Sequence, residues 1–135
     1  MFIAGGAAGT GIEAGLDTGK VWIGLSAPQL TAPAVLNGLP AKIVGATYPK
    51  NPFAIVSPAA KPILTPQDMV GKKIGLQATA VILLKALLAK NNIAEKDVGI
   101  VTIGADMSPL LTGQVDAITG WLTNTTALKV LGPDR

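Results

Sequence analysis

The fold is decided by a stretch in the middle of the chain, Thr65-Pro66-Gln67-Asp68-Met69-Val70-Gly71-Lys72-Lys73-Ile74-Gly75. Thr65 is a good helix cap, a proline fits the first helical position, and Asp68 stands where the acid of a capping box belongs. A glycine ends this helix after little more than one turn, and Lys73–Leu76 continues as a short strand. The stretch therefore predicts a brief helix that leads directly into a strand.

Strands and helices alternate on both sides of this stretch. Strands are expected at Met1–Ala4, Val21–Leu25, Ala41–Thr47, Phe53–Ser57, Lys73–Leu76, Val98–Ile103 and Val115–Gly120. Helices are expected at Ile12–Leu16, from Pro28 toward Asn37, from Thr79 toward Asn91, at Ser108, and from Thr123 or Asn124 to Gly132. The strands are continuous apolar runs, as in a parallel sheet that helices cover on both faces. The sequence thus predicts an α/β protein.

Two further features bear on how these elements are organised. The segment from Pro58 to Pro62 is a proline-marked connection and a candidate domain boundary. The helix expected after Thr79 is apolar nearly all round, interrupted only by Lys85 and Lys90, so it should be largely buried.

Composition excludes several classes of protein. Hydrophobic residues make up 49% of the chain and charged residues 14%, which excludes a disordered chain. The net charge of +3 comes from scattered lysines, so nucleic acid is not an expected partner. The chain has no cysteine and no histidine, which excludes thiol nucleophiles, disulfides, catalytic pairs with histidine and most zinc sites. No catalytic residue, metal site or cofactor is predicted. Prolines and glycines break the longest uncharged stretch, so no membrane span is expected, and no export signal is visible.

Candidate binding residues lie where strands end and helices begin. In open parallel sheets, ligands bind outside the carboxyl ends of the strands, where helix N-termini present free N–H groups. Gly5–Thr10, Gln77–Thr79 and Gly120–Asn124 occupy such positions, and Ser26 is a fourth candidate. The glycine-rich segment can equally be a flexible turn, because it has neither dinucleotide-binding nor phosphate-loop spacing.

Aromatic residues add a second set of candidates. Trp121 can offer a flat apolar face at a strand exit, with the amide of Asn124 nearby. Alternatively, Trp121 packs under the last helix and Asn124 only caps it. Tyr48 and Phe53 flank a proline-rich loop, where each either lines a cleft or fills a gap. The acidic residues form no evident pair, and nothing assembles into base, nucleophile and orienting group, so the residues predict a binder rather than an enzyme.

The central stretch resembles the "P-x-D-L-x-G-K-x-I-G" signature of type II solute-binding proteins. Further segments are similar to the nitrate, sulfonate, taurine and thiamine-pyrimidine branch: Val98–Val101, Gly104-Ala105-Asp106, Pro109-Leu110-Leu111, Gly113-Gln114-Val115-Asp116-Ala117 and Gly120-Trp121-Leu122-Thr123-Asn124. The resemblance covers nearly the whole chain. It implies Rossmann-like, parallel-sheet lobes of a type II periplasmic binding protein, present here incompletely.

The resemblance also implies an organisation and a function. Residues 1–57 would belong to lobe one, 58–64 to the hinge or connection, and 65–135 to lobe two. The protein would be the solute-binding component of an ABC importer, capturing a sulfonate, nitrate or pyrimidine-like solute non-covalently in the cleft between the lobes. Its partners would be that solute and the importer's membrane subunits, in the periplasm or lipid-anchored outside the cytoplasm.

Alternatives to this function remain open. One is an enzyme of the same fold that makes a pyrimidine precursor, although fungal relatives with that activity use a histidine and a cysteine-rich motif that this sequence lacks. Another is a gene fragment without independent function, which would self-associate. The expected ligand-binding residues are Gly5, Gly6, Thr10, Ser26, Tyr48, Gln77, Thr79, Gly120, Trp121 and Asn124.

Overall fold

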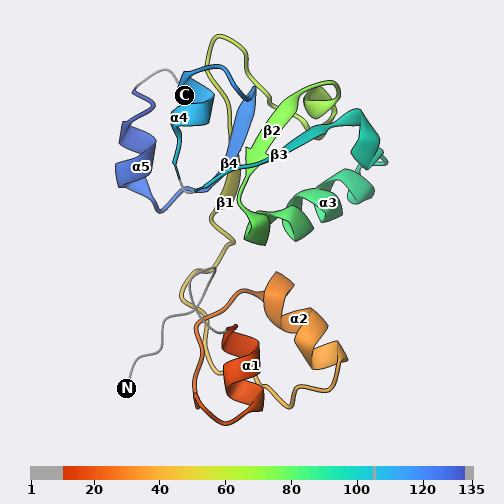
Figure 1. The fold of residues 1–135 in the computed structure, drawn as a ribbon, viewed down its shortest axis with the longest axis vertical. Helices are drawn as coiled ribbons and strands as arrows, with labels where there is room; N and C mark the ends of the chain where they lie inside the picture. The colour runs from red at the N-terminus through yellow and green to blue at the C-terminus, as the bar shows by residue number, and fades with distance from the viewer. Residues whose placement is uncertain (1–10, 105, 133–135) are drawn as a thin grey trace. The chain divides into compact units, whose positions relative to one another are not determined.

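The computed structural model describes residues 11–104 and 106–132. Contacts divide the chain into two compact units, Met1–Thr47 and Tyr48–Arg135 (Figure 1). The strand expected at Met1–Ala4 and the glycine-rich segment Gly5–Thr10 lie outside the described residues. No helix in the part that the structure describes has the length and apolar character needed to cross a membrane.

The first unit is built around two helices, α1 (Ile12–Asp17) and α2 (Pro28–Leu36). Both follow the sequence prediction: α2 has proline at its first position, and Gly38, at φ 101°, lies just past its end in a backbone conformation that favours glycine.

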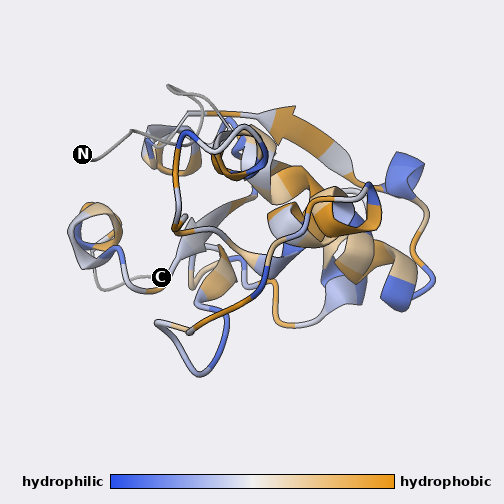
Figure 2. Ribbon diagram, turned by 90° about the horizontal axis from the view of Figure 1, so that it is seen from below, coloured by the Kyte–Doolittle hydropathy of each residue, from blue (hydrophilic) through white to orange (hydrophobic). Residues whose placement is uncertain are grey.

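The strands expected at Val21–Leu25 and Ala41–Thr47 are absent from the described part of this unit, so that prediction is wrong. An apolar run forms a strand only where a second strand takes up its backbone hydrogen bonds, and none does so here. The apolar residues of these runs instead lie in connecting segments without regular secondary structure, and Figure 2 shows hydrophobic residues outside helices and strands.

The second unit is a sheet with helices. Its elements are β1 (Phe53–Val56), the 3₁₀ helix η2 (Pro66–Met69), β2 (Lys73–Leu76), the 3₁₀ helix η3 (Ala78–Ala80), α3 (Val81–Lys90), the 3₁₀ helix η4 (Glu95–Asp97), β3 (Gly99–Thr102), α4 (Ser108–Leu111), β4 (Ala117–Trp121) and α5 (Thr125–Lys129). The strand order is β1-β4-β2-β3, with β2 parallel to both β3 and β4. The predicted α/β class is confirmed.

One pair of neighbouring strands, β1 and β4, departs from the predicted parallel arrangement. β1 runs antiparallel to β4, with Phe53 opposite Trp121 and Val56 opposite Ile118. The connection from β1 to β2 contains no long helix that could carry the chain back to the starting edge of the sheet, as a parallel crossover requires. β1 therefore begins at the edge where β2 and β4 end.

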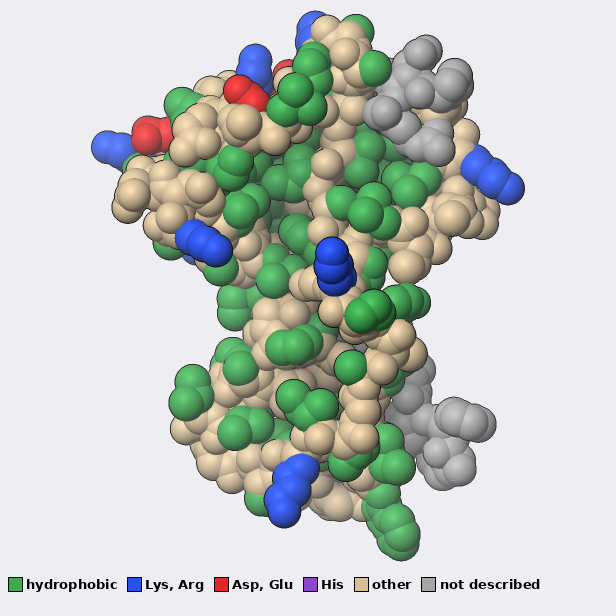
Figure 3. All heavy atoms as spheres, turned by 180° about the vertical axis from the view of Figure 1, so that it is seen from behind, with side chains coloured by type: hydrophobic (Ala, Val, Ile, Leu, Met, Phe, Trp, Pro, Cys, Tyr) green, Lys and Arg blue, Asp and Glu red, His purple; other side chains and the backbone are tan. Residues whose placement is uncertain are grey.

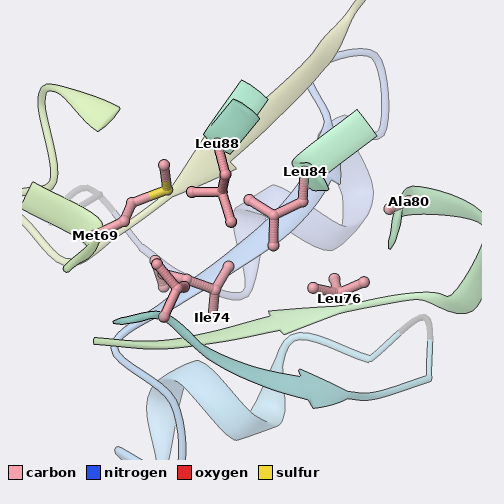
Figure 4. Packing of buried hydrophobic residues seen from close by; sticks show 8 residues of the cluster. Met69, Ile74, Leu76, Ala80, Leu84 and Leu88 are labelled. Atoms are coloured by element: carbon pink, nitrogen blue, oxygen red, sulfur yellow. The ribbon is translucent and has the colours of Figure 1, made fainter. Parts of the chain in front are cut away.

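The sheet buries a different set of residues on each face. On one face α3 packs over the sheet, and Ile74, Leu76, Leu84 and Leu88 are fully buried. Figure 4 shows Leu84 and Leu88 pointing from α3 toward Ile74 on β2. The second cluster gathers residues from α4, β4 and α5 together with their neighbours: Met107, Leu110, Val115, Ile118, Leu128 and Leu131. Alternation along β4 sends Ala117 to the first cluster and Ile118 to the second.

The helix start expected at Thr65 is confirmed, although the helix is a single 3₁₀ turn. The Asp68 carboxylate accepts hydrogen bonds from the Thr65 N–H at 2.7 Å, the Thr65 hydroxyl at 3.0 Å and the Leu64 N–H at 3.0 Å. These donors, the Thr65 N–H first, hold the pKa of Asp68 below its ordinary value. The buried Met69 of this turn joins the core under α3, which fixes the entry into β2.

The assignment of residues 1–57 and 65–135 to two lobes stays a prediction, because the structure does not identify lobes as such. By contacts alone, the chain divides between Thr47 and Tyr48. β1, which the sequence places with lobe one, pairs with β4 inside the second unit. Residues 58–64 connect β1 to η2 within that same unit.

Candidate functional site

A small depression lies at the carboxyl edge of the sheet in the second unit. Its lining combines residues from the ends of β2 and β4, the start of β1 and the first turns of η3 and α3: Phe53, Gln77, Thr79, Ala80, Leu83, Thr119, Gly120 and Trp121. The chain leaves β2 toward β3 on one side and returns to β4 on the other side of β2. The depression therefore lies at the topological switch point of the sheet, where open α/β sheets bind ligands.

Two aromatic rings form the apolar wall of this depression. Phe53 and Trp121 are cross-strand partners, and their rings meet edge to face with centroids 6.0 Å apart at 77°. Trp121 remains 36% exposed, so part of the indole is available to a ligand. Of the two roles that the sequence left open, packing under the last helix is not the observed one, because α5 buries Leu128 in the cluster on the other face.

Polar side chains form the rest of the lining. Gln77 and Thr79 come from the turn between β2 and α3, and Thr119 comes from β4. None of these three side chains has a hydrogen-bond partner among the residues that the structure describes. The first turn of η3 adds the backbone N–H groups of Ala78 and Thr79, whereas the next two N–H groups are already bonded to the Gln77 and Ala78 carbonyls. The depression thus offers neutral donors and acceptors next to an aromatic wall.

The depression is small and carries no charge. Its volume of about 10 Å³ has room for about one water molecule, far below the roughly 300–1,000 Å³ of ordinary ligand pockets. None of the lining residues is acidic or basic. Among the described residues, no group of three acidic side chains is placed to hold a metal ion.

The carboxylates with a lowered pKa are not among the residues that line the depression. The pKa of Glu13 is lowered mainly by the Ser26 hydroxyl, which donates to Oε1 at 2.5 Å. The pKa of Asp106 is lowered by hydrogen bonds from Ser108, its side chain first. Asp106, like Asp68, is stabilised in the charged form by donors in its own turn, whereas the donors to Glu13 are the hydroxyls of Ser26 and Thr31 farther along the first unit.

A larger hollow of about 250 Å³ lies at the opposite edge, where β2 and β4 begin. Lys61, Lys72 and Asp116 line it. The Asp116 carboxylate accepts the N–H of Lys73 at 2.8 Å, and the Asp116 N–H donates to the Lys73 carbonyl at 2.8 Å. Asp116 therefore joins the starts of two neighbouring strands.

The structure brings together four of the ten residues expected from the sequence, Gln77, Thr79, Gly120 and Trp121. Ser26 lies in the first unit, where its hydroxyl donates to Glu13. Tyr48 is 53% exposed and does not line the depression. Asn124 caps α5, accepting the Ala127 N–H at 3.2 Å. Gly5, Gly6 and Thr10 lie outside the described residues.

Sequence reasoning did not single out Thr119, Leu83 or Ala80, and it left open whether Phe53 lines a cleft or packs inside. Thr119 is an isolated polar residue in an otherwise apolar strand, and that irregularity is a usable signal. Phe53 reaches the site because β1 is antiparallel, a pairing that the apolar run does not reveal.

A mostly parallel sheet, covered on both faces and open at its carboxyl edge, defines the fold as part of a type II periplasmic binding protein. The chain belongs to the NMT1/THI5-like family, whose model matches residues 3–134. The resemblance found in the sequence is thereby confirmed. No curated protein sequence matches the chain.

Solved structures agree on the fold. The periplasmic aliphatic sulphonate-binding protein SsuA from Escherichia coli is 23% identical, with a TM-score of 0.54 over 62% of this chain and 31% of its own. The alkanesulfonate-binding protein SsuA from Xanthomonas axonopodis pv. citri, bound to MOPS, is 28% identical, with a TM-score of 0.53 over 62% of this chain and 30% of its own. The chain thus spans about a third of the length of these structures.

Proposed function

We propose that this chain is part of the solute-binding component of an ABC importer and captures a small solute without covalent chemistry. The solute class is a small anion or a heteroaromatic compound, such as a sulfonate, nitrate or a pyrimidine. Membership of the NMT1/THI5-like family supports this proposal. So does the similarity to a protein that binds alkanesulfonates.

One observation carries the proposal. Unpartnered polar side chains and an aromatic pair meet at the switch point of the sheet, where a ligand can use both. A solute held there would place a polar atom against Gln77, Thr79 and Thr119 and a flat or apolar part against Trp121. Hydrogen bonds and ring contacts would hold it, which is the usual pattern for small-molecule sites.

The same lining favours a binder over an enzyme of the same fold. General acid–base or nucleophilic catalysis needs a titratable or activated group within reach of the substrate. The residues around the depression provide amide, hydroxyl, indole and hydrocarbon groups only. We therefore propose that a bound solute is released unchanged.

Titration should detect this binding. Replacing Trp22 by phenylalanine leaves Trp121 as the single tryptophan of the chain. We expect its fluorescence to change in a saturable way with MOPS, sodium nitrate or 4-aminopyrimidine. Amide chemical shifts of Gln77, Thr79 and Gly120 should move over the same concentration range, because these residues surround the same depression.

Two results would contradict the proposal. No saturable response to any of the three probes would remove the ligand class. Mass spectrometry of the recovered probe checks the chemistry, since a probe converted to a new compound would show an enzyme. Shifts confined to the hollow beside Lys61 and Asp116 would place binding at the wrong edge of the sheet.

We infer the partner and compartment from the same family. The partner would be the membrane subunits of an ABC importer, and the site of action would be outside the cytoplasm, in the periplasm or on a lipid anchor. The E. coli structure is of a periplasmic protein, which supports this placement through the shared fold.

We also propose that the 135-residue chain self-associates through its first unit. Six large apolar side chains there are at least 77% exposed: Trp22, Ile23, Leu25, Leu36, Ile43 and Val44. At about 100–150 Å² each, they present on the order of 700 Å² of apolar surface, near the roughly 800 Å² per partner of a standard interface. Figure 3 shows hydrophobic side chains spread over the visible face of this unit.

The backbone of these segments points to pairing with a second copy. Residues 22–25 and 42–47 make no backbone hydrogen bond to any described residue. Apolar segments with unpaired N–H and C=O groups can pair with another chain, as the exposed edge of a sheet does. A second copy supplies segments of the same kind and lets both copies satisfy these groups.

Light scattering coupled to size exclusion should therefore show a dimer or larger species for the unaltered chain. The double variant Ile23→Lys, Ile43→Lys should be monomeric, because both side chains are exposed and the change spares the core. Leu64→Lys in the second unit, at a side chain 84% exposed, is the matched control and should leave the mass unchanged. A monomeric unaltered chain would contradict the proposal.

A further inference from the structure

Thr119 is an exception in the core of the second unit. It is the one buried polar residue among those described, at 3% exposure, and it lies between Ile118 and Gly120 in β4. Alternation along the strand places it on the α3 side with Ala117, opposite Ile55 of β1. A hydrocarbon side chain would suit this position, and valine has nearly the same shape and a high strand preference.

The hydroxyl of Thr119 has no protein partner in the described part of the chain, as noted above. No buried side-chain nitrogen or oxygen atom of the described residues lacks a partner. The Thr119 oxygen must therefore have contact with solvent, and the depression that Thr119 lines provides it. Thr119 is almost completely buried, yet its one polar side-chain atom remains accessible from the depression. The hydroxyl is therefore in a position to contact a ligand atom.

The surroundings of this hydroxyl favour an acceptor atom on the ligand. The Gln77 amide, the Thr79 hydroxyl and the free N–H groups in the first turn of η3 can all donate a hydrogen bond at this end of the sheet. No acidic side chain lines the depression to compete for them. A ligand oxygen or ring nitrogen that carries negative or partial negative charge meets these donors, whereas a hydrocarbon group leaves them unpaired.

We propose that Thr119 is the specificity-determining residue on the floor of this site and donates a hydrogen bond to an acceptor atom of the solute. This inference rests on the proposed function and assigns one residue and one ligand chemistry to it. The aromatic wall of Phe53 and Trp121 accepts many solutes, since ring faces discriminate weakly. The hydroxyl selects among them, because a site built around a hydrogen bond rejects analogues that lack the partner atom.

The test compares MOPS binding by variants that remove or keep the hydroxyl of residue 119. Binding is measured by NMR titration of the full 135-residue chain. Thr119→Val removes the hydroxyl and keeps the shape, and it should weaken MOPS binding by about 10–100-fold. Thr119→Ser keeps the hydroxyl and should bind within about threefold of the unaltered chain. Thr102→Val, at an exposed threonine at the end of β3, is the matched control and should not change binding.

A stability measurement separates ligand recognition from a structural role. Without probe, Thr119→Val should unfold at the same or a higher denaturant concentration than the unaltered chain, because the hydroxyl makes no protein hydrogen bond. A clear loss of stability in Thr119→Val would show a structural role and overturn the inference. Equal MOPS binding by Thr119→Val and the unaltered chain would overturn the inference alone. Failure of the unaltered chain to bind MOPS, nitrate or 4-aminopyrimidine would overturn the proposed function as well.

Discussion

Replacing Leu84 by alanine is expected to lower the free energy of unfolding of the second unit by about 3–5 kcal/mol. Leu84 is fully buried on α3 and points into the cluster that includes Ile74, Leu76 and Leu88 (Figure 4). Truncation removes the transfer free energy of three carbon atoms and leaves a cavity that the sheet below cannot fill by moving. Because small domains are stable by only about 5–15 kcal/mol, this loss is a large share of the total.

Urea unfolding followed by far-ultraviolet circular dichroism measures this loss, with the denaturant slope checked for constancy. Ile82→Ala is the matched control on the same helix, at a side chain 42% exposed, and should cost well under half as much. Equal losses at residues 82 and 84 would contradict the packing of α3 on the sheet.

Replacing Trp121 by alanine is expected to weaken solute binding by about 30-fold or more, as for other aromatic residues at the centre of a contact. The indole forms the exposed half of the aromatic wall, and Phe53 holds it edge to face at 6.0 Å. Without it, the ligand loses its apolar contact, and water gains access to the hydrogen bonds beside it. Trp121→Phe keeps a flat ring and should fall between alanine and the unaltered chain.

The other tryptophan of the chain provides the control. Trp22 is 93% exposed in the first unit, and Trp22→Ala should not change binding of MOPS by the second unit. Circular dichroism of Trp121→Ala confirms that the sheet is retained before binding is compared. Unchanged affinity in Trp121→Ala would exclude the depression at the carboxyl edge as the binding surface.

The site was partly predictable because it follows from the order of elements. A strand that ends at Leu76 and runs into a helix start fixes Gln77 and Thr79 at the carboxyl edge, whatever the rest of the sheet does. The same reasoning places Gly120 and Trp121 after β4. The same reasoning does not extend to Ser26, because the run before it, Val21–Leu25, forms no strand in the described part of the first unit.

The neighbours of these residues could not be predicted in the same way. Thr119 and Phe53 join the site through the antiparallel pairing of β1 with β4 and through the face on which each side chain emerges. Asn124 turned out to cap α5, one of two roles that its position allowed. Local sequence fixes where a helix or strand begins, whereas a side chain's partners depend on segments far away in the chain.

By itself, the sequence determined the α/β class, the helix start at Thr65, the strand that follows it and the family to which the chain belongs. These depend on local signals, namely capping residues, glycine and proline positions and the length of apolar runs. Only the tertiary structure decided the strand order, the direction of β1 and the face of α3 that is buried. α3 is apolar nearly all round, yet Leu84 is fully buried while Ile82 is 42% exposed. Burial is a property of the surface that packs against a side chain, and that surface comes from other parts of the chain.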